Sequence, residues 1–133
     1  MRGVALIFGV LMAVTGCATM ASNEPVPAGR SLEPLTQGWE QHLAVTWSLD
    51  QRPGGQSVDG YVRNISPYDL ANVRVLVEGL DANGQVAAQY LGRLPGELRG
   101  GGRLYFEVPV VPAASYRVRV FSYERLESAG LMS

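Results

Sequence analysis

The stretch "VRVLVEGLDANGQVAAQYLG", residues 73–92, contains the clearest β-hairpin pattern in this chain. Valines recur at every second position in its first part, at Val73, Val75 and Val77. This spacing is the period of a half-buried β-strand. The tetrapeptide "DANG" at 81–84 is typical of a hairpin turn, in which Gly84 can adopt a positive φ. Residues 85–92 continue as a weaker strand, so the stretch predicts two antiparallel strands joined by a tight turn.

The same period of two recurs on both sides of this hairpin. The apolar rows are Leu43, Val45, Trp47 and Leu49; Val58, Gly60 and Val62; Leu104, Phe106, Val108 and Val110; and Tyr116, Val118 and Val120. Clusters of Gly, Pro, Asn and Asp separate these segments. We therefore predict an all-β domain over residues 39–126, a small immunoglobulin-like antiparallel β-sandwich of about six to seven strands. Trp47 is expected to fill the centre of its core, and residues 127–133 to form a C-terminal tail.

Residues 1–16 have the three parts of a secretion signal. Arg2 supplies a positive charge, residues 4–14 form an apolar run, and small residues follow it. The run is shorter than the roughly 20 apolar residues that a membrane span requires. The chain's single cysteine, Cys17, comes directly after this segment.

The sequence "VTGC" at 14–17 resembles the box of bacterial lipoproteins. The resemblance implies cleavage between Gly16 and Cys17, a diacylglycerol on the Cys17 thiol, and a fatty acid such as palmitate on the new amino terminus. Ala18 stands where an inner-membrane sorting Asp would be, which implies the outer membrane, facing the periplasm. A plain secreted protein with an incidental cysteine and a retained apolar anchor are the alternatives.

Residues 17–38 are rich in small residues and proline and have no apolar period. They are therefore expected to form the lipidated N-terminus and a flexible tether between the membrane and the folded domain. Without the signal segment, the chain has 10 basic and 12 acidic residues. This balance lacks the basic excess of nucleic-acid-binding proteins. The sequence does not indicate an oligomeric state.

The segment from 58 to 121 resembles the bacterial FxLYD-type domains, which are immunoglobulin-like modules of envelope proteins. The matching residues are Gly60, Val62 and Asn64; Val73, Val75, Val77, Asp81 and Gly84; Pro95, Gly96 and Gly100 to Gly102; and Tyr105 and Phe106. The naming motif is altered here, because "VEGLD" at 77–81 replaces its aromatic residues. The resemblance implies an accessory or binding module rather than an enzyme.

The sequence does not predict catalysis, a cofactor or a metal centre. His42 is the only histidine, stands at the start of a predicted strand, and is expected to be a solvated edge residue. With Cys17 acylated, no His/Cys cluster is available for a metal. The carboxylates are scattered over outward or turn positions, so a hydrolase that uses two of them is the least favoured alternative.

Aromatic and arginine side chains on the polar faces of the strands form a candidate recognition face. It consists of Tyr61, Arg63, Arg74, Leu76, Tyr105, Arg117, Arg119 and Phe121. Ordinary cross-strand packing is the alternative explanation for these residues. The sequence therefore favours a lipid-anchored envelope protein that binds a partner protein as an adaptor or assembly factor. A binder of a small molecule or glycan is the second possibility.

Overall fold

The computed structural model describes residues 22–25 and 31–126, so Gly16, Cys17, the predicted signal segment and the tail lie outside the described residues. No helix in the described part has the length and hydrophobicity needed to cross a bilayer. In chain order, the elements are β1 (Ser22–Pro25), the 3₁₀ helix η1 (Trp39–Gln41), β2 (Leu43–Arg52), β3 (Gly55–Asn64), β4 (Leu70–Leu80), β5 (Val86–Arg93), β6 (Glu97–Leu98), β7 (Arg103–Val110) and β8 (Ser115–Arg125).

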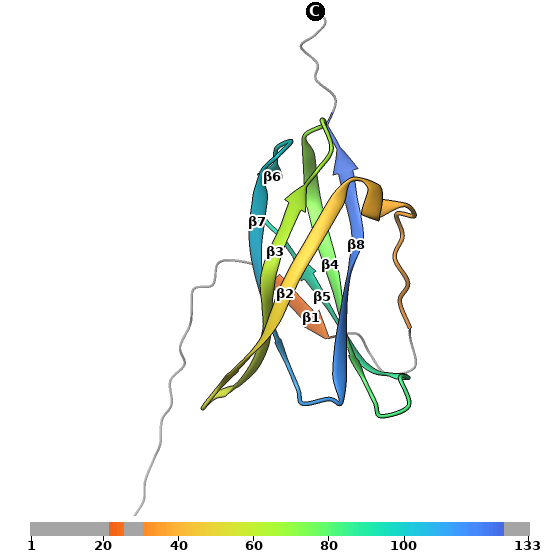
Figure 1. The fold of residues 1–133 in the computed structure, drawn as a ribbon, viewed down its shortest axis with the longest axis vertical. Coiled ribbons are helices and arrows are strands. Elements are labelled where there is room, and N and C mark those ends of the chain that lie inside the picture. The colour runs from red at the N-terminus through yellow and green to blue at the C-terminus, as the bar shows by residue number, and fades with distance from the viewer. Residues whose placement is uncertain (1–21, 26–30, 127–133) are drawn as a thin grey trace, which may run out of the picture.

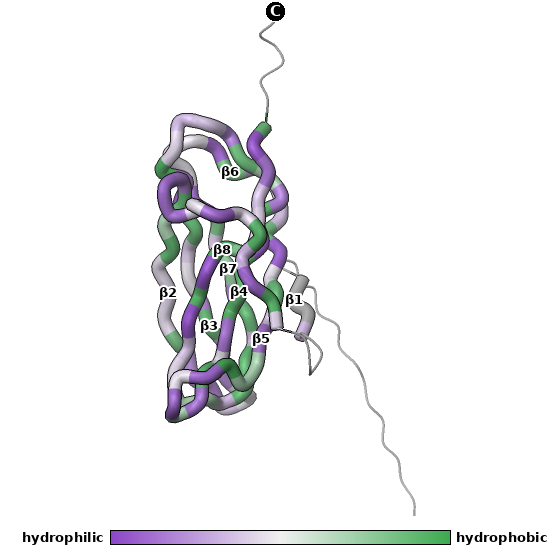
Figure 2. Tube along the Cα trace, turned by 90° about the vertical axis from the view of Figure 1, so that its right-hand side faces the viewer, coloured by the Kyte–Doolittle hydropathy of each residue, from purple (hydrophilic) through white to green (hydrophobic). Residues whose placement is uncertain are grey.

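The strands form two antiparallel sheets that pack face to face (Figure 1). In the five-stranded sheet, β4 lies between β5 and β8, with β1 outside β5 and the short β6 at the start of β4. In the three-stranded sheet, β3 lies between β2 and β7. Figure 2 shows β2 and β3 on one side of the molecule and β5 and β1 on the other. The predicted small β-sandwich is thus confirmed, including the β4–β5 hairpin, in which Gly84 has φ 81°.

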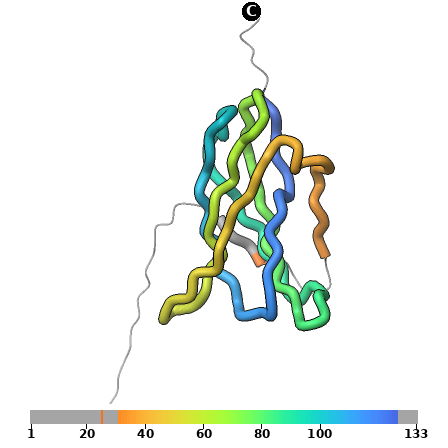
Figure 3. The backbone as a smooth tube through the Cα atoms, in the orientation of Figure 1, coloured from red at the N-terminus to blue at the C-terminus, as the bar shows by residue number. Residues whose placement is uncertain are grey.

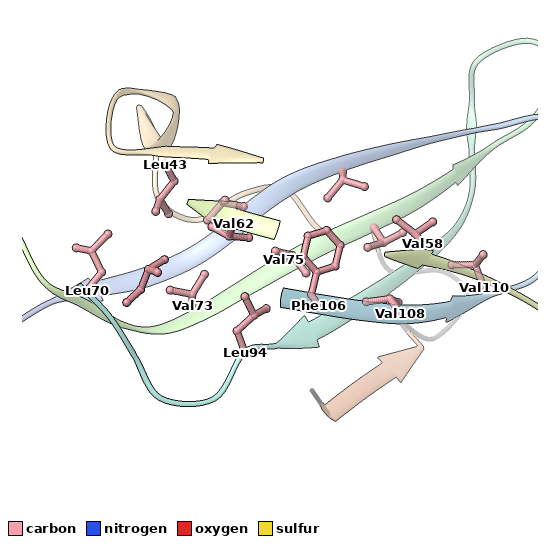
Figure 4. Packing of buried hydrophobic residues seen from close by; sticks show 14 residues of the cluster. Leu43, Val58, Val62, Leu70, Val73, Val75, Leu94, Phe106, Val108 and Val110 are labelled. Atoms are coloured by element: carbon pink, nitrogen blue, oxygen red, sulfur yellow. The ribbon is translucent and has the colours of Figure 1, made fainter. Parts of the chain in front are cut away.

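The inner faces of the two sheets make one apolar core (Figure 4). The three alternating valines of β4, Val73, Val75 and Val77, are each 0% exposed. Phe106 of β7 is also fully buried and is among the largest side chains of the core. Truncating such a residue typically costs about 3 to 5 kcal/mol of stability, because a cavity remains.

The prediction that Trp47 fills the core is wrong, because its side chain is 38% exposed. Trp47 lies on β2, an edge strand, and pairs with Gly60 in the neighbouring strand β3. A Cβ atom at Gly60 would lie 2.0 Å from the Thr46 carbonyl oxygen, so the β2 backbone passes very close to β3 there. On its other side, Gly60 pairs with Phe106, which is the aromatic residue that fills the core.

Ser22–Pro25 pair with β5 as β1, and residues 32–36 are hydrogen-bonded to the sandwich, which differs from the prediction of a flexible tether over residues 17–38. The side-chain amide of Gln89 accepts a hydrogen bond from Leu32 N and donates one to Leu32 O, both at 2.9 Å. The backbone amide of Leu35 donates to Phe121 O at 2.8 Å. Figure 3 shows this segment running beside β8. Backbone pairing of this kind needs no apolar period, so the sequence pattern did not indicate it.

Asn64 fixes the loops at one end of the sandwich. Its side chain is buried, and Nδ2 donates to Tyr68 O at 2.6 Å and to Leu98 O at 2.9 Å. Oδ1 accepts hydrogen bonds from the backbone amide and the hydroxyl of Ser66. One side chain thus satisfies polar groups of the loop after β3 and of strand β6, which are far apart in the sequence, as buried polar groups require.

Candidate recognition surfaces

The eight residues of the predicted recognition face do not share one surface. Tyr61, Arg63 and Tyr105 lie on the outer face of the three-stranded sheet, where register pairs Tyr61 with Tyr105. The other five lie on the outer face of the five-stranded sheet, on the opposite side of the sandwich: Arg74, Leu76, Arg117, Arg119 and Phe121. The structure therefore does not place the eight predicted residues on a single surface.

The outer face of the five-stranded sheet is largely covered. Leu76 is 0% exposed and Phe121 is 5% exposed, although both point away from the core between the sheets. The segment 31–36 crosses this face, held by Gln89 on β5 and by the Phe121 carbonyl on β8. Glu33 of the segment also forms an ion pair with Arg119 at 3.4 Å. For Leu76 and Phe121, packing is therefore the better explanation.

Glu78 organises the polar part of the same face. It is 0% exposed and receives hydrogen bonds from Arg117 Nε at 2.7 Å, Arg119 Nη2 at 3.0 Å and Gln89 Nε2 at 2.9 Å. Burial by itself raises the pKa of Glu78, but the hydrogen bonds from Arg117, Gln89 and Arg119 outweigh it and hold the pKa below its ordinary value. Two of the four predicted recognition arginines, Arg117 and Arg119, are thus committed to a buried carboxylate.

The outer face of the three-stranded sheet is open and has an aromatic centre. Tyr61 is 36% exposed and Tyr105 is 39% exposed, and their ring centroids lie 5.5 Å apart with an interplanar angle of 64°. This edge-to-face arrangement is favourable for aromatic pairs. The guanidinium carbon of Arg103 lies 4.1 Å from the centroid of the Tyr61 ring. Arg63 and Arg103 pair across the strands, and both are exposed.

The other end of this face is acidic. Asp59 and Glu107 pair across β3 and β7, and Asp50 lies nearby on β2. Arg52 reaches all three carboxylates, at 2.6 Å from Asp50, 3.4 Å from Glu107 and 3.7 Å from Asp59. Burial raises the pKa of Asp59, and the charges of Glu107 and Asp50 raise it further, against a hydrogen bond from Ser57 and the charge of Arg52. One arginine therefore leaves this end of the face with a net charge of −2.

An open depression of about 440 Å³ lies on the same face, between its aromatic centre and its acidic end. Asp59, Tyr61 and Tyr105 contribute to its wall. The complete lining is Thr46, Trp47, Ser48, Asp59, Gly60, Tyr61 and Tyr105. Aromatic surfaces beside a few polar groups are typical of ligand sites, so this depression is a second candidate site within the same surface.

His42 is half-buried, not solvated as predicted, and its Nδ1 lies 3.2 Å from the hydroxyl of Tyr123. Burial raises the pKa of this Tyr123 hydroxyl. Within residues 22–25 and 31–126, no three His, Cys, Asp or Glu side chains are grouped so that they could hold a metal ion. The contact of His42 with Tyr123 links β8 to the residue that precedes β2, and we assign it a structural role.

The predicted recognition face did not include Asp50, Arg52, Asp59, Arg103 or Glu107, although alternation already placed Asp59, Arg103 and Glu107 on the polar faces of their strands. The missing information was strand pairing. "DGYVR" at 59–63 and "RLYFE" at 103–107 carry the same order of residue types in reverse, and antiparallel pairing brings like residues together. This reversed pattern was a signal that could have placed Asp59, Arg103 and Glu107 on the face.

Comparison of the chain with protein-family models, with curated proteins and with solved structures found no match.

Proposed function

We propose that this chain is a lipid-anchored protein of the bacterial cell envelope, held in the outer membrane facing the periplasm by acylation of Cys17. Its β-sandwich is a non-catalytic module that binds a partner protein, as an adaptor or assembly factor. The lipoprotein-like box "VTGC" supports the anchor. Two or more acyl chains are enough for stable membrane attachment.

The observation that carries the binding role is the exposed Tyr61–Tyr105 pair, with arginines at one end of its face and carboxylates at the other. Tyrosine and arginine are enriched in protein interfaces and among the few residues that supply most of the binding energy. The outer face of the five-stranded sheet is a weaker candidate, since the chain's own segment 31–36 covers it.

A crosslinking pull-down from native envelopes tests this role. The wild type is compared with the double variant Tyr61→Ser/Tyr105→Ser, and Tyr68→Ser is the matched control, because Tyr68 is 38% exposed but lies outside this face. We expect a stoichiometric partner that the double variant loses and the control keeps, with unchanged thermal unfolding. A partner retained by the double variant would contradict the proposed surface.

The anchor has its own test. Cys17→Ala removes the thiol that would be acylated, so we expect the protein to leave the membrane fraction and the partner to be captured less often. If the variant remains in the membrane fraction, the retained apolar segment rather than a lipid holds the protein.

A glycan of the envelope is the second candidate ligand, favoured by the depression of about 440 Å³ beside Tyr61 and Tyr105. Aromatic rings provide apolar surface for a sugar ring, and Asp59 can accept hydrogen bonds from hydroxyl groups. Titration of the purified protein with envelope glycans distinguishes the two candidates. Binding that is lost in Tyr61→Ser/Tyr105→Ser without any protein partner would favour the glycan.

A further inference from the structure

Three successive pairs on the outer face of the three-stranded sheet join residues of the same kind. These like pairs are Arg63 with Arg103, Tyr61 with Tyr105, and Asp59 with Glu107. Like charges that lie directly opposite each other destabilise a sheet, whereas opposite charges stabilise it. Opposite charges in the two end pairs would therefore stabilise the isolated domain more than the like charges that it carries. Cross-strand charge pairing within one molecule does not explain this arrangement.

The basic and acidic pairs do not neutralise each other within one molecule. Four residues separate Arg63 from Asp59 along β3, which corresponds to about 13 Å in an antiparallel strand. This exceeds the screening length of about 8 Å at physiological salt. Among the described residues, neither Arg63 nor Arg103 forms an ion pair. The face therefore presents a basic row, an aromatic row and an acidic row to its surroundings.

We infer that this face binds the same face of a second copy of the chain, in an isologous two-fold arrangement. The two-fold axis lies in the plane of the interface, perpendicular to the strands, at the level of Tyr61 and Tyr105. Rotation about this axis reverses the order of the three rows in the second copy relative to the first. It places the basic row of each copy over the acidic row of the other, and each tyrosine over its counterpart. A C₂ interface requires this kind of self-complementarity.

The charges of the two ends balance. Arg63 and Arg103 carry +2, and the acidic end, which is Asp50, Asp59 and Glu107 with Arg52, carries −2. Each copy therefore offers two guanidinium groups, neither of them in an ion pair among the described residues, to a carboxylate cluster with a net charge of −2. Arg103 is already ordered by its position over the Tyr61 ring, which reduces the entropy lost on binding. Attachment of both copies to one membrane would raise their effective concentration.

This inference rests on the proposed function, because it names a partner for the same surface. A cysteine crosslink in the full-length chain tests it. In the two-fold arrangement Tyr105 lies over its own counterpart, so the variant Tyr105→Cys should form a disulfide-linked dimer under mild oxidation. Tyr68→Cys is the matched control, since Tyr68 is 38% and Tyr105 is 39% exposed. Both variants retain Cys17, so any crosslink through Cys17 affects them equally.

Charge reversal gives the second arm. Arg63→Glu/Arg103→Glu makes both ends of the face acidic, and Asp59→Arg/Glu107→Arg makes both ends basic. Each change, added to Tyr105→Cys, should reduce the crosslinked fraction at least about tenfold. Mixing the two variants should restore a crosslinked heterodimer, which also shows that both are folded.

Two results would overturn the inference: a Tyr105→Cys crosslink no stronger than that of Tyr68→Cys, or a crosslink that charge reversal leaves unchanged. If self-crosslinking fails but the pull-down still loses a different protein with Tyr61→Ser/Tyr105→Ser, the inference is wrong and the proposed function stands. If the wild type and Tyr61→Ser/Tyr105→Ser capture the same partner equally well, the proposed surface itself is wrong.

Discussion

Arg63 of β3 lies directly opposite Arg103 of β7, and both side chains are exposed. Among the described residues, no carboxylate forms an ion pair with either arginine. Arg103 lies over the ring of Tyr61, whereas Arg63 has no comparable aromatic contact among the described residues. A surface that retains a repulsive pair beside exposed tyrosines fits recognition better than it fits stability.

Arg63→Glu should therefore stabilise the isolated domain. The change converts a like pair into an opposite pair with Arg103, and we expect the free energy of unfolding to rise by about 0.5 kcal/mol. Denaturant unfolding measures this at a concentration low enough to exclude association. Arg63→Gln, which only removes the repulsion, should give a smaller gain. A loss of stability in both variants would mean that Arg63 is needed for the fold.

Glu78→Gln should lower the free energy of unfolding at neutral pH and make that free energy depend less on pH. Because the pKa of Glu78 is lowered in the folded state, its ionised form stabilises the fold above the ordinary carboxylate range. That contribution is lost as the pH falls through the folded-state pKa. We expect a loss of about 2 to 3 kcal/mol at pH 7, since two arginines lose a charged partner.

Urea unfolding between about pH 7 and pH 3 checks this prediction. The wild type should lose stability over this interval, and Glu78→Gln should lose much less of it. Glu124→Gln, at an exposed position of the same strand as Arg117 and Arg119, is the control and should behave like the wild type. Parallel pH profiles for the wild type and Glu78→Gln would refute the role given to Glu78.

Gly60→Ala should be strongly destabilising, because its Cβ would lie 2.0 Å from Thr46 O and 2.7 Å from Trp47 Cα, which are backbone atoms. We expect a loss of at least about 3 kcal/mol, or a displaced β2. Gly54→Ala is the matched control: no atom lies within 4 Å of its added Cβ and its φ is not positive. Equal thermal midpoints for the two variants would contradict the close approach of β2 to β3.

Gln89→Ala should release the segment 31–36 from the sandwich. The variant removes both hydrogen bonds to Leu32, each contributing about 1 kcal/mol. Amide hydrogen exchange at Leu32 and Leu35 should therefore accelerate about tenfold or more. Gln85→Ala, in the exposed turn between β4 and β5, should leave exchange at these amides unchanged. Unaltered exchange in Gln89→Ala would show that other contacts hold the segment.

Alternation of residues was sufficient to predict the strands that carry the core. Val73, Val75 and Val77 are buried as their spacing indicated, and the turn at Gly84 joins β4 to β5 as expected. These features follow from local geometry, since a strand places every second side chain on one face. The two-sheet arrangement then follows because each sheet must cover one apolar face.

Features that depend on which strands are neighbours could not be predicted in this way. Trp47 has the right position in its strand for burial, but β2 is an edge strand and its partner residue is Gly60. Leu76 sits on the polar face of β4 and is nevertheless buried, on the face that residues 31–36 cross. Strand pairing also determined that the predicted recognition residues divide between two surfaces.

Photo-crosslinking from position 105 can show whether the outer face of the three-stranded sheet contacts another protein. A photoreactive phenylalanine analogue replaces Tyr105 in the full-length chain in native envelopes, and the same analogue at Tyr68 serves as the control. Exposure of the two positions is nearly equal, at 39% and 38%. We predict a discrete protein adduct, from a second copy or another envelope protein, at position 105 and none at position 68. Equal adducts at both positions, or none at 105, would contradict the claim that the outer face of the three-stranded sheet is a recognition surface.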